Sequence, residues 1–194
     1  MSSAANSDID IASRALILIG AEPITSFSSD TTEALVASNL YEDTVRTALC
    51  NTRWRFATNQ FVMNRLSEEP TGRFTAAYQI PSDNLMVHAV TVDDLILEYT
   101  LYGDKIFCDV SSTSEVVVDY TFRALEQNFP SYFTLAVQYA LAASFAISIA
   151  RDEQLAQLLD RKSMQLMQQA RTLDSQQQTT RKLTTSRFIV ERRG

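Results

Sequence analysis

The chain has 194 residues, which is enough for one domain with a core of its own and too few for two full-sized domains. Hydrophobic residues make up 45% of it and charged residues 21%, a composition that excludes a disordered chain. The net charge of −6 argues against a general nucleic-acid-binding surface, because such binding depends largely on neutralising phosphates.

The cysteines and the first residues bear on the compartment. Cys50 and Cys108 are too few for a disulfide framework and have no C-x-x-C spacing, so we expect a reduced, intracellular setting. The segment MSSAANSDID has neither a basic n-region nor an apolar h-region. A secretion signal is therefore not expected.

A first helix is predicted close to the N-terminus. Ser7 or Asp8 can cap it, and apolar residues then recur at helical spacing as far as Ile19. Gly20 follows as a stop signal. We therefore expect a short helix with one apolar face.

A second helix is predicted after a loop rich in Ser, Thr and Asp. Asp30 with Glu33 forms a capping-box arrangement, and we expect the helix to run to about Arg53. Its apolar stripe contains many small residues, which allow a neighbouring helix to approach closely. The stripe consists of Ala34, Ala37, Tyr41, Val45 and Ala48.

From Trp54 the pattern changes to short β-type segments bounded by turns. Gly103–Asp104 predicts a hairpin turn, because glycine readily adopts the positive φ that such a turn needs. We expect a small antiparallel sheet inserted between helices. Its predicted strands are Phe61–Leu66, Phe74–Ile80, Leu85–Val92, Leu95–Leu101, Lys105–Val110 and Glu115–Phe122.

Residues 132–150 contain no charged side chain. Their length alone permits a membrane span. Gln138, Ser144 and Ser148 interrupt the stretch, however, alanine supplies much of its apolar character, and Asp152 and Glu153 follow directly. These features favour a buried central helix over a membrane-associated one.

Residues 152–174 predict a further helix with an apolar seam that requires a partner helix. Asp152 can cap it after a tight turn at Arg151–Asp152, and one long kinked helix through residues 132–173 is the alternative. The seam alternates small and large residues. It consists of Ala156, Leu159, Ser163, Leu166, Ala170 and Leu173.

The last segment differs in composition from the rest of the chain. Residues 175–194 are rich in Gln, Thr, Ser and Arg, have no periodicity, and carry five basic side chains against Glu191. We expect a flexible basic tail that contains a short strand-like motif, Phe188–Val190. The body before it holds the acidic excess.

The predicted fold class is therefore α+β: a bundle of about four helices with an inserted antiparallel sheet and an extended C-terminal tail. Residues 1–54 and 126–174 supply the helices of one helical domain. Residues 55–125 form the β-rich insert, and residues 175–194 form the tail.

Few residues suggest catalysis. His88 is the single histidine, and no nucleophile-elbow motif accompanies it; the four glycines never cluster, which argues against a phosphate-binding loop. The acid pairs Glu68–Glu69, Asp93–Asp94 and Asp152–Glu153 are the basis of an alternative, a hydrolase of cell-wall glycan. Turns and helix starts explain the same pairs without chemistry.

Aromatic and basic residues alternate at Arg53, Trp54, Arg55 and Phe56. Such a pattern can stack on bases. The preferred interpretation is that the two aromatic side chains anchor the junction between helix and sheet, while the two arginines point outward toward a neighbouring subunit.

Five motifs follow one another along the chain: Leu16–Ile24 (LILIGAEPI), Trp54–Asn59 (WRFATN), Tyr78–Asp83 (YQIPSD), Val116–Arg123 (VVVDYTFR) and Pro130–Phe133 (PSYF). An Ala-rich helix follows the first motif and another follows the last. In this order the motifs resemble the tail tubular protein A family, the head-to-tail adaptors of short-tailed bacteriophages. The resemblance covers about residues 7–173 by element order.

The resemblance implies a structural ring subunit, typically dodecameric, that joins the portal to the tail nozzle or the tail tube and its terminator protein. DNA would leave the capsid through the ring without sequence-specific binding. The resemblance supplies no catalytic residue, cofactor or metal, so we expect a non-enzymatic protein of the virion neck, assembled in the host cytoplasm and without a membrane.

In such adaptors the C-terminal segment engages the portal, which implies this role for the basic tail. The expected portal-binding residues are Arg181, Lys182, Arg187, Phe188, Ile189, Val190, Arg192 and Arg193. The residues expected to pack against neighbouring subunits are Arg53, Arg55, Ala156, Leu159, Leu166 and Leu173.

Overall fold

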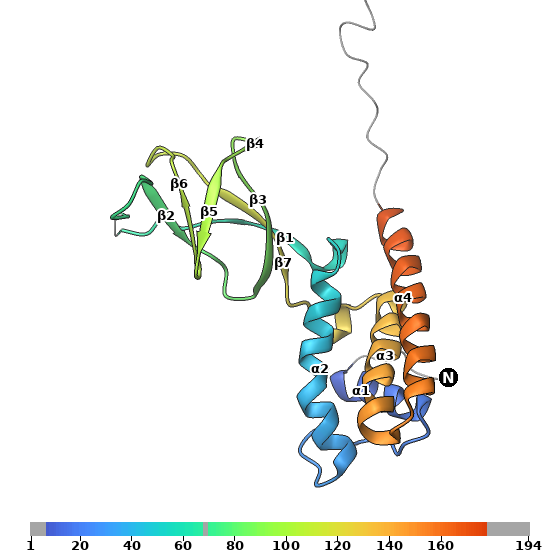
Figure 1. Ribbon diagram of the computed structural model, residues 1–194. Coiled ribbons are helices and arrows are strands. Elements are labelled where there is room, and N and C mark those ends of the chain that lie inside the picture. Colours follow the sequence, from blue (N-terminus) through green and yellow to red (C-terminus); the bar gives the residue numbers. More distant parts are fainter. Residues whose placement is uncertain (1–6, 68–69, 178–194) are drawn as a thin grey trace, which may run out of the picture.

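The computed structural model describes residues 7–67 and 70–177. It confirms the α+β class, with a helical body and a β-rich insert between the second and third helices (Figure 1). The helices of the body are α1 (Asp8–Leu18), α2 (Thr32–Cys50), α3 (Ser131–Phe145) and α4 (Glu153–Ser175). Most of the predicted basic tail, residues 178–194, lies outside the described residues.

Helix α1 begins and ends where the sequence predicts. The Ser7 hydroxyl accepts a hydrogen bond from the Asp10 amide at 3.1 Å. At the other end Gly20 has a φ of 75°, and the amides of Gly20 and Ala21 donate to the carbonyls of Ile17 and Leu16. This pair of bonds is a Schellman motif, which satisfies the last carbonyls of the helix.

The predicted cap of α2 is wrong by one residue. Thr31, not Asp30, is the N-cap, and its hydroxyl accepts a hydrogen bond from the Ala34 amide at 3.2 Å. Glu33 therefore occupies the second helical position, where its charge still favours the helix N-terminus. The helix ends at Cys50, earlier than the expected Arg53.

Two separate helices follow Pro130, not one kinked helix. Helix α3 widens into a π-helical turn, η3 (Ala146–Ala150), which ends at Arg151 with a φ of 53°. Asp152 then caps α4 by accepting a hydrogen bond from the Leu155 amide at 3.0 Å. The tight turn and the Asp152 cap are therefore both confirmed.

The uncharged stretch is the central helix of the body. The segment Ser131–Ala150 is long and apolar enough to cross a membrane by length and composition, but 56% of its apolar window is buried inside the protein. Figure 1 shows α3 between α2 and α4, and α1 also contacts it. A soluble core helix passes the same test of length and composition.

The insert contains two antiparallel sheets, whereas one was predicted. One has the order β1-β7-β3-β4 and the other β2-β6-β5. The predicted strand Leu95–Leu101 is divided between them, because the chain crosses from one sheet to the other at Leu97–Glu98. The strands are β1 (Thr58–Val62), β2 (Ala76–Gln79), β3 (Asn84–Val92), β4 (Leu95–Ile96), β5 (Tyr99–Tyr102), β6 (Lys105–Cys108) and β7 (Val117–Phe122).

Two tight turns shape the insert. The predicted hairpin is confirmed, since Gly103 has a φ of 61° and Tyr102 pairs with Lys105 across it. A second hairpin joins β3 to β4 through Asp93 and Asp94, whose φ angles are 50° and 63°. Two consecutive positive φ angles match the twist of the flanking strands, and aspartate tolerates them better than most residues do.

The seam of α4 packs on α3, but its register drifts from the prediction. Ala156, Leu159, Ser163 and Ala170 are buried as expected. Met167 and Asp174 replace the other two seam positions, so Leu166 is half-buried and Leu173 is 47% exposed. A straight helix has 3.6 residues per turn, and a pattern read at 3.5 therefore falls out of register by its end.

Arg151 offers a test of the break between α3 and α4, because its positive φ strains any residue with a Cβ. We expect Arg151→Gly to raise the free energy of unfolding by roughly 0.5–1 kcal/mol, measured by urea titration. The matched control is Arg161→Gly, at an exposed position in the interior of α4. It should lower the free energy of unfolding by about 1 kcal/mol. Equal losses in both variants would contradict this account of the turn.

Candidate functional site

An aromatic cluster joins the helical body to the insert. Trp54 is fully buried after α2, and its indole nitrogen donates to the Ala48 carbonyl at 2.9 Å. Its ring meets the Phe133 ring at a centroid distance of 5.1 Å, and Phe56 and Phe129 pack on Phe133 at 4.9 Å each. The predicted anchoring role of Trp54 and Phe56 is thus confirmed.

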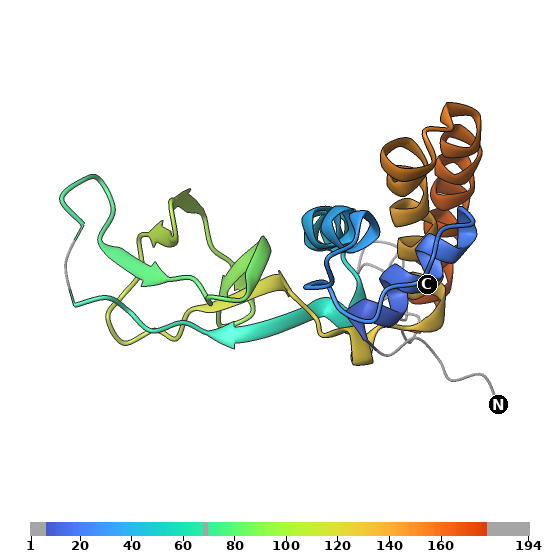
Figure 2. The ribbon, with the colours of Figure 1, turned by 90° about the horizontal axis from the view of Figure 1, so that it is seen from below.

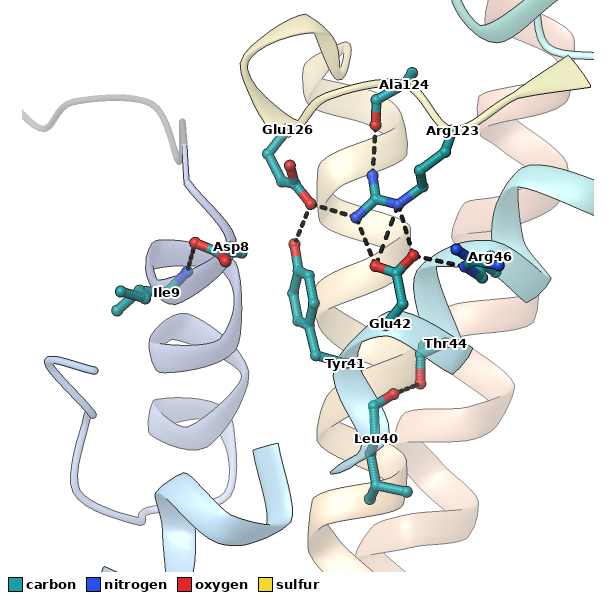
Figure 3. Close-up of polar contacts among 10 residues, drawn as sticks. All are labelled: Asp8, Ile9, Leu40, Tyr41, Glu42, Thr44, Arg46, Arg123, Ala124 and Glu126. Carbon is teal, nitrogen blue, oxygen red and sulfur yellow. Dashed lines mark hydrogen bonds and ion pairs between the residues drawn. The ribbon is translucent and has the colours of Figure 1, made fainter. Parts of the chain in front are cut away.

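A charged cluster closes the same junction on another side, and Arg123, just past β7, lies at its centre (Figure 3). Its guanidinium donates to the Glu42 carboxylate at 2.9–3.2 Å and to Glu126 at 2.6 Å. It also donates to the Ala124 carbonyl. Glu126 further accepts a hydrogen bond from the Tyr41 hydroxyl at 3.3 Å. The insert is thereby tied to α2 and to the turn η2 (Glu126–Asn128).

The ionisation of this cluster favours the bonded state. Hydrogen bonds from Arg123 hold the pKa of the Glu42 carboxyl below its usual range. Burial lowers the pKa of Arg123, but the hydrogen bonds to Glu42 and Glu126 outweigh this effect and the pKa is raised. Burial, with the charge of Glu126, raises the pKa of Tyr41. The ion pair between Arg123 and Glu42 therefore persists across the neutral pH range.

A second polar anchor lies where α4 ends. Asp174 is 4% exposed and accepts hydrogen bonds from the Arg55 amide at 3.0 Å and the Tyr132 hydroxyl at 2.9 Å. Burial, and then the bond to Asp174, raises the pKa of Tyr132 to about 12. The Arg55 guanidinium donates to the Asp174 carbonyl at 3.0 Å. The point where the basic tail leaves the body is thereby fixed to α3 and to the start of the insert.

The two arginines of the alternating motif contact their own chain. Arg53 forms an ion pair with Asp119 of β7 at 2.7 Å, and Arg55 binds Asp174 as described above. The guanidinium of Arg53 nevertheless stays half-exposed. A contact with a neighbouring subunit, as predicted, remains a prediction.

The other predicted interface residues have different positions. Ala156 and Leu159 are buried against α3 within the chain, so only Leu166 and Leu173 keep exposed surface. The predicted portal-binding residues, 181–193, all lie outside the described residues.

A groove runs along the helical body between α2 and α4. Residues of α3, which lies between these two helices, also line it. Its volume is about 710 Å³, within the range of ligand-binding clefts. Small side chains of α3 and α4 line it, including Ala140, Ala143 and Ala156. Asp43 of α2 and Asp160 of α4 belong to the lining, and Glu153 adds a third carboxylate. The described residues that line this groove include no basic side chain.

The predicted catalytic candidates do not come together. Asp93–Asp94 form the turn between β3 and β4, Asp152 caps α4, and Glu68–Glu69 lie outside the described residues. His88 shares a hydrogen bond of 2.7 Å with the Thr121 hydroxyl, and burial together with nearby Arg53 lowers its pKa. Within residues 7–67 and 70–177, no group of three metal-ligating side chains is present.

A scan of protein-family models and a search of curated proteins found no match to this chain. Sequence reasoning missed Glu42, Arg123 and Asp174. The last could have been found from a helical period of 3.6, which puts Asp174 on the buried face with Ala170.

The Arg123 cluster predicts a clear difference between two arginines that share Glu42. Arg123→Ala removes a guanidinium that is only 17% exposed and leaves two carboxylates without it, so we expect a loss of about 2–3 kcal/mol in the free energy of unfolding. Arg46→Ala is the matched control: its pair with Glu42 is exposed and should contribute less than about 0.5 kcal/mol. Similar losses in urea titrations of the two variants would refute the special role of Arg123.

Proposed function

We propose that this chain is the structural subunit of a head-to-tail adaptor in a tailed bacteriophage. It assembles into a ring, taken to be dodecameric, between the portal and the tail nozzle or tube. The ring surrounds the channel through which DNA leaves the capsid, without binding its sequence. Such a protein belongs to the virion neck, assembles in the host cytoplasm, and needs no cofactor, catalysis or membrane.

The observation that carries this proposal is the two-part shape of the molecule. The insert stands out from the helical body on the paired strands β1 and β7, as Figures 1 and 2 show. A subunit with two separate contact regions can meet a different partner with each. The order of elements is the one that the family resemblance implies, with helices toward the portal and the insert toward the tail.

Exposed apolar side chains on both parts support a role in assembly. Leu95 and Ile96 are 73% and 83% exposed on β4, an edge strand of the insert. Ile17 and Leu35 are 58% and 63% exposed on α1 and α2. We expect these exposed apolar residues to be buried against partners in the assembly.

Electron microscopy of the chain mixed with the portal protein of the same phage tests the proposal. We expect closed rings stacked on the portal, because the subunit presents separate surfaces for its neighbours and for the portal. A chain that stays monomeric, with portals that remain bare, would overturn the adaptor function.

A shortened chain tests how much the basic tail contributes to portal binding. Ending the chain at Gln177 keeps every described contact, so folding should persist while portal binding weakens by about tenfold or more from the loss of five basic residues. The matched control changes two exposed basic residues of α4, Arg161→Gln with Lys162→Gln, and should bind the portal as the parent does. Unchanged binding after truncation would remove the tail from the portal contact.

A further inference from the structure

The groove between α2 and α4 has the character of a site for an extended basic and apolar segment. Its small-residue lining, with Ala140, Ala143 and Ala156, leaves room for side chains that the body does not supply. Met164 and Ile147, also in the lining, are 59% and 64% exposed, so apolar surface is available there. Apolar area removed from water by an occupant would stabilise the complex.

The charges that line the groove determine which charge its occupant carries. Asp43 on α2 and Asp160 on α4 both line the groove, and Glu153 lines it nearer the start of α4. A lining of apolar and acidic residues favours a segment whose apolar residues are flanked by arginines or lysines, because the opposite charges then pair as the apolar residues are buried.

The C-terminal segment of this chain has that pattern. Phe188, Ile189 and Val190 follow Arg187 and precede Arg192–Arg193. No other stretch of the chain sets three consecutive large apolar residues between arginines, with only Glu191 as an acid among them. Pattern and charge are thus complementary to the groove.

The length of the chain also fits. From Gln177 back to Asp160, α4 rises about 26 Å. The chain from Gln177 to Arg187 spans up to about 33 Å when extended. The segment can therefore turn back and run antiparallel to α4 along the groove of the same subunit.

We propose that the groove between α2 and α4 binds the C-terminal segment Arg187–Arg193 of its own chain in the free subunit. A short tether gives the segment a millimolar effective concentration at the groove, which a second copy in dilute solution does not reach. This inference stands apart from the proposed function, since it concerns the isolated chain. In an adaptor, the portal and the groove would compete for one segment.

Disulfide trapping in the full-length chain tests it. Met164→Cys on the groove side of α4 is paired with Ile189→Cys, in a chain that also carries Cys50→Ser. Gln165→Cys with Ile189→Cys is the matched control, because Gln165 is the next residue and lines a different depression, on the other side of α4. Both positions are exposed, so neither cysteine disturbs the core.

Under mild oxidation, the 164–189 pair should form an intrachain disulfide about tenfold faster than the 165–189 pair. The tether is the same for both pairs, and only residue 164 lines the groove that holds the segment. The product should migrate as a monomer on a non-reducing gel. Equal rates for the two pairs, or disulfide-linked dimers as the main product, would overturn the proposal.

A second measurement separates the contribution of charge to the trapping rate from the contribution of the tether. Asp43→Asn with Asp160→Asn should slow trapping of the 164–189 pair toward the control rate, as should about 1 M salt, which screens exposed pairs beyond about 3 Å. A trapping rate that neither change affects would refute the charge complementarity on which the choice of segment rests.

Discussion

The guanidinium of Arg123 is the contact on which the relation between insert and helical body depends. It follows β7, and its partners Glu42 and Glu126 belong to α2 and to η2. The Cζ atom of Arg123 also lies 5.8 Å from the centre of the Phe129 ring, so the charged cluster contacts the aromatic cluster. Removing the arginine would take this partner from the partly buried Glu126 and leave Glu42 with Arg46 alone, which costs more than the pair itself contributes.

Asp174 provides the complementary constraint on the other side of the junction. By accepting hydrogen bonds from the Arg55 amide and the Tyr132 hydroxyl, it fixes the end of α4 against α3 and the first residues of the insert. The C-terminal segment therefore leaves the body from a defined place. That origin determines which surfaces the segment can reach, and the acidic groove along α4 is one of them.

Local signals predicted much of this fold, and long-range contacts explain what they missed. Gly20, the Gly103 hairpin and the Asp152 cap act through their own neighbours, so sequence suffices for them. Glu42 and Arg123 are 81 residues apart in the sequence, with the insert between them, and no periodicity indicates that they pair. The α4 register failed at Leu173 because a small error in period accumulates along a long helix.

We expect the insert and the helices to unfold as one cooperative unit, because this junction joins them. Trp54, the only tryptophan, lies buried in it and reports on it directly by fluorescence. Urea unfolding followed by Trp54 emission and by far-ultraviolet circular dichroism should give coincident transitions. Exposure of Trp54 at a lower urea concentration than the loss of helix would contradict the account.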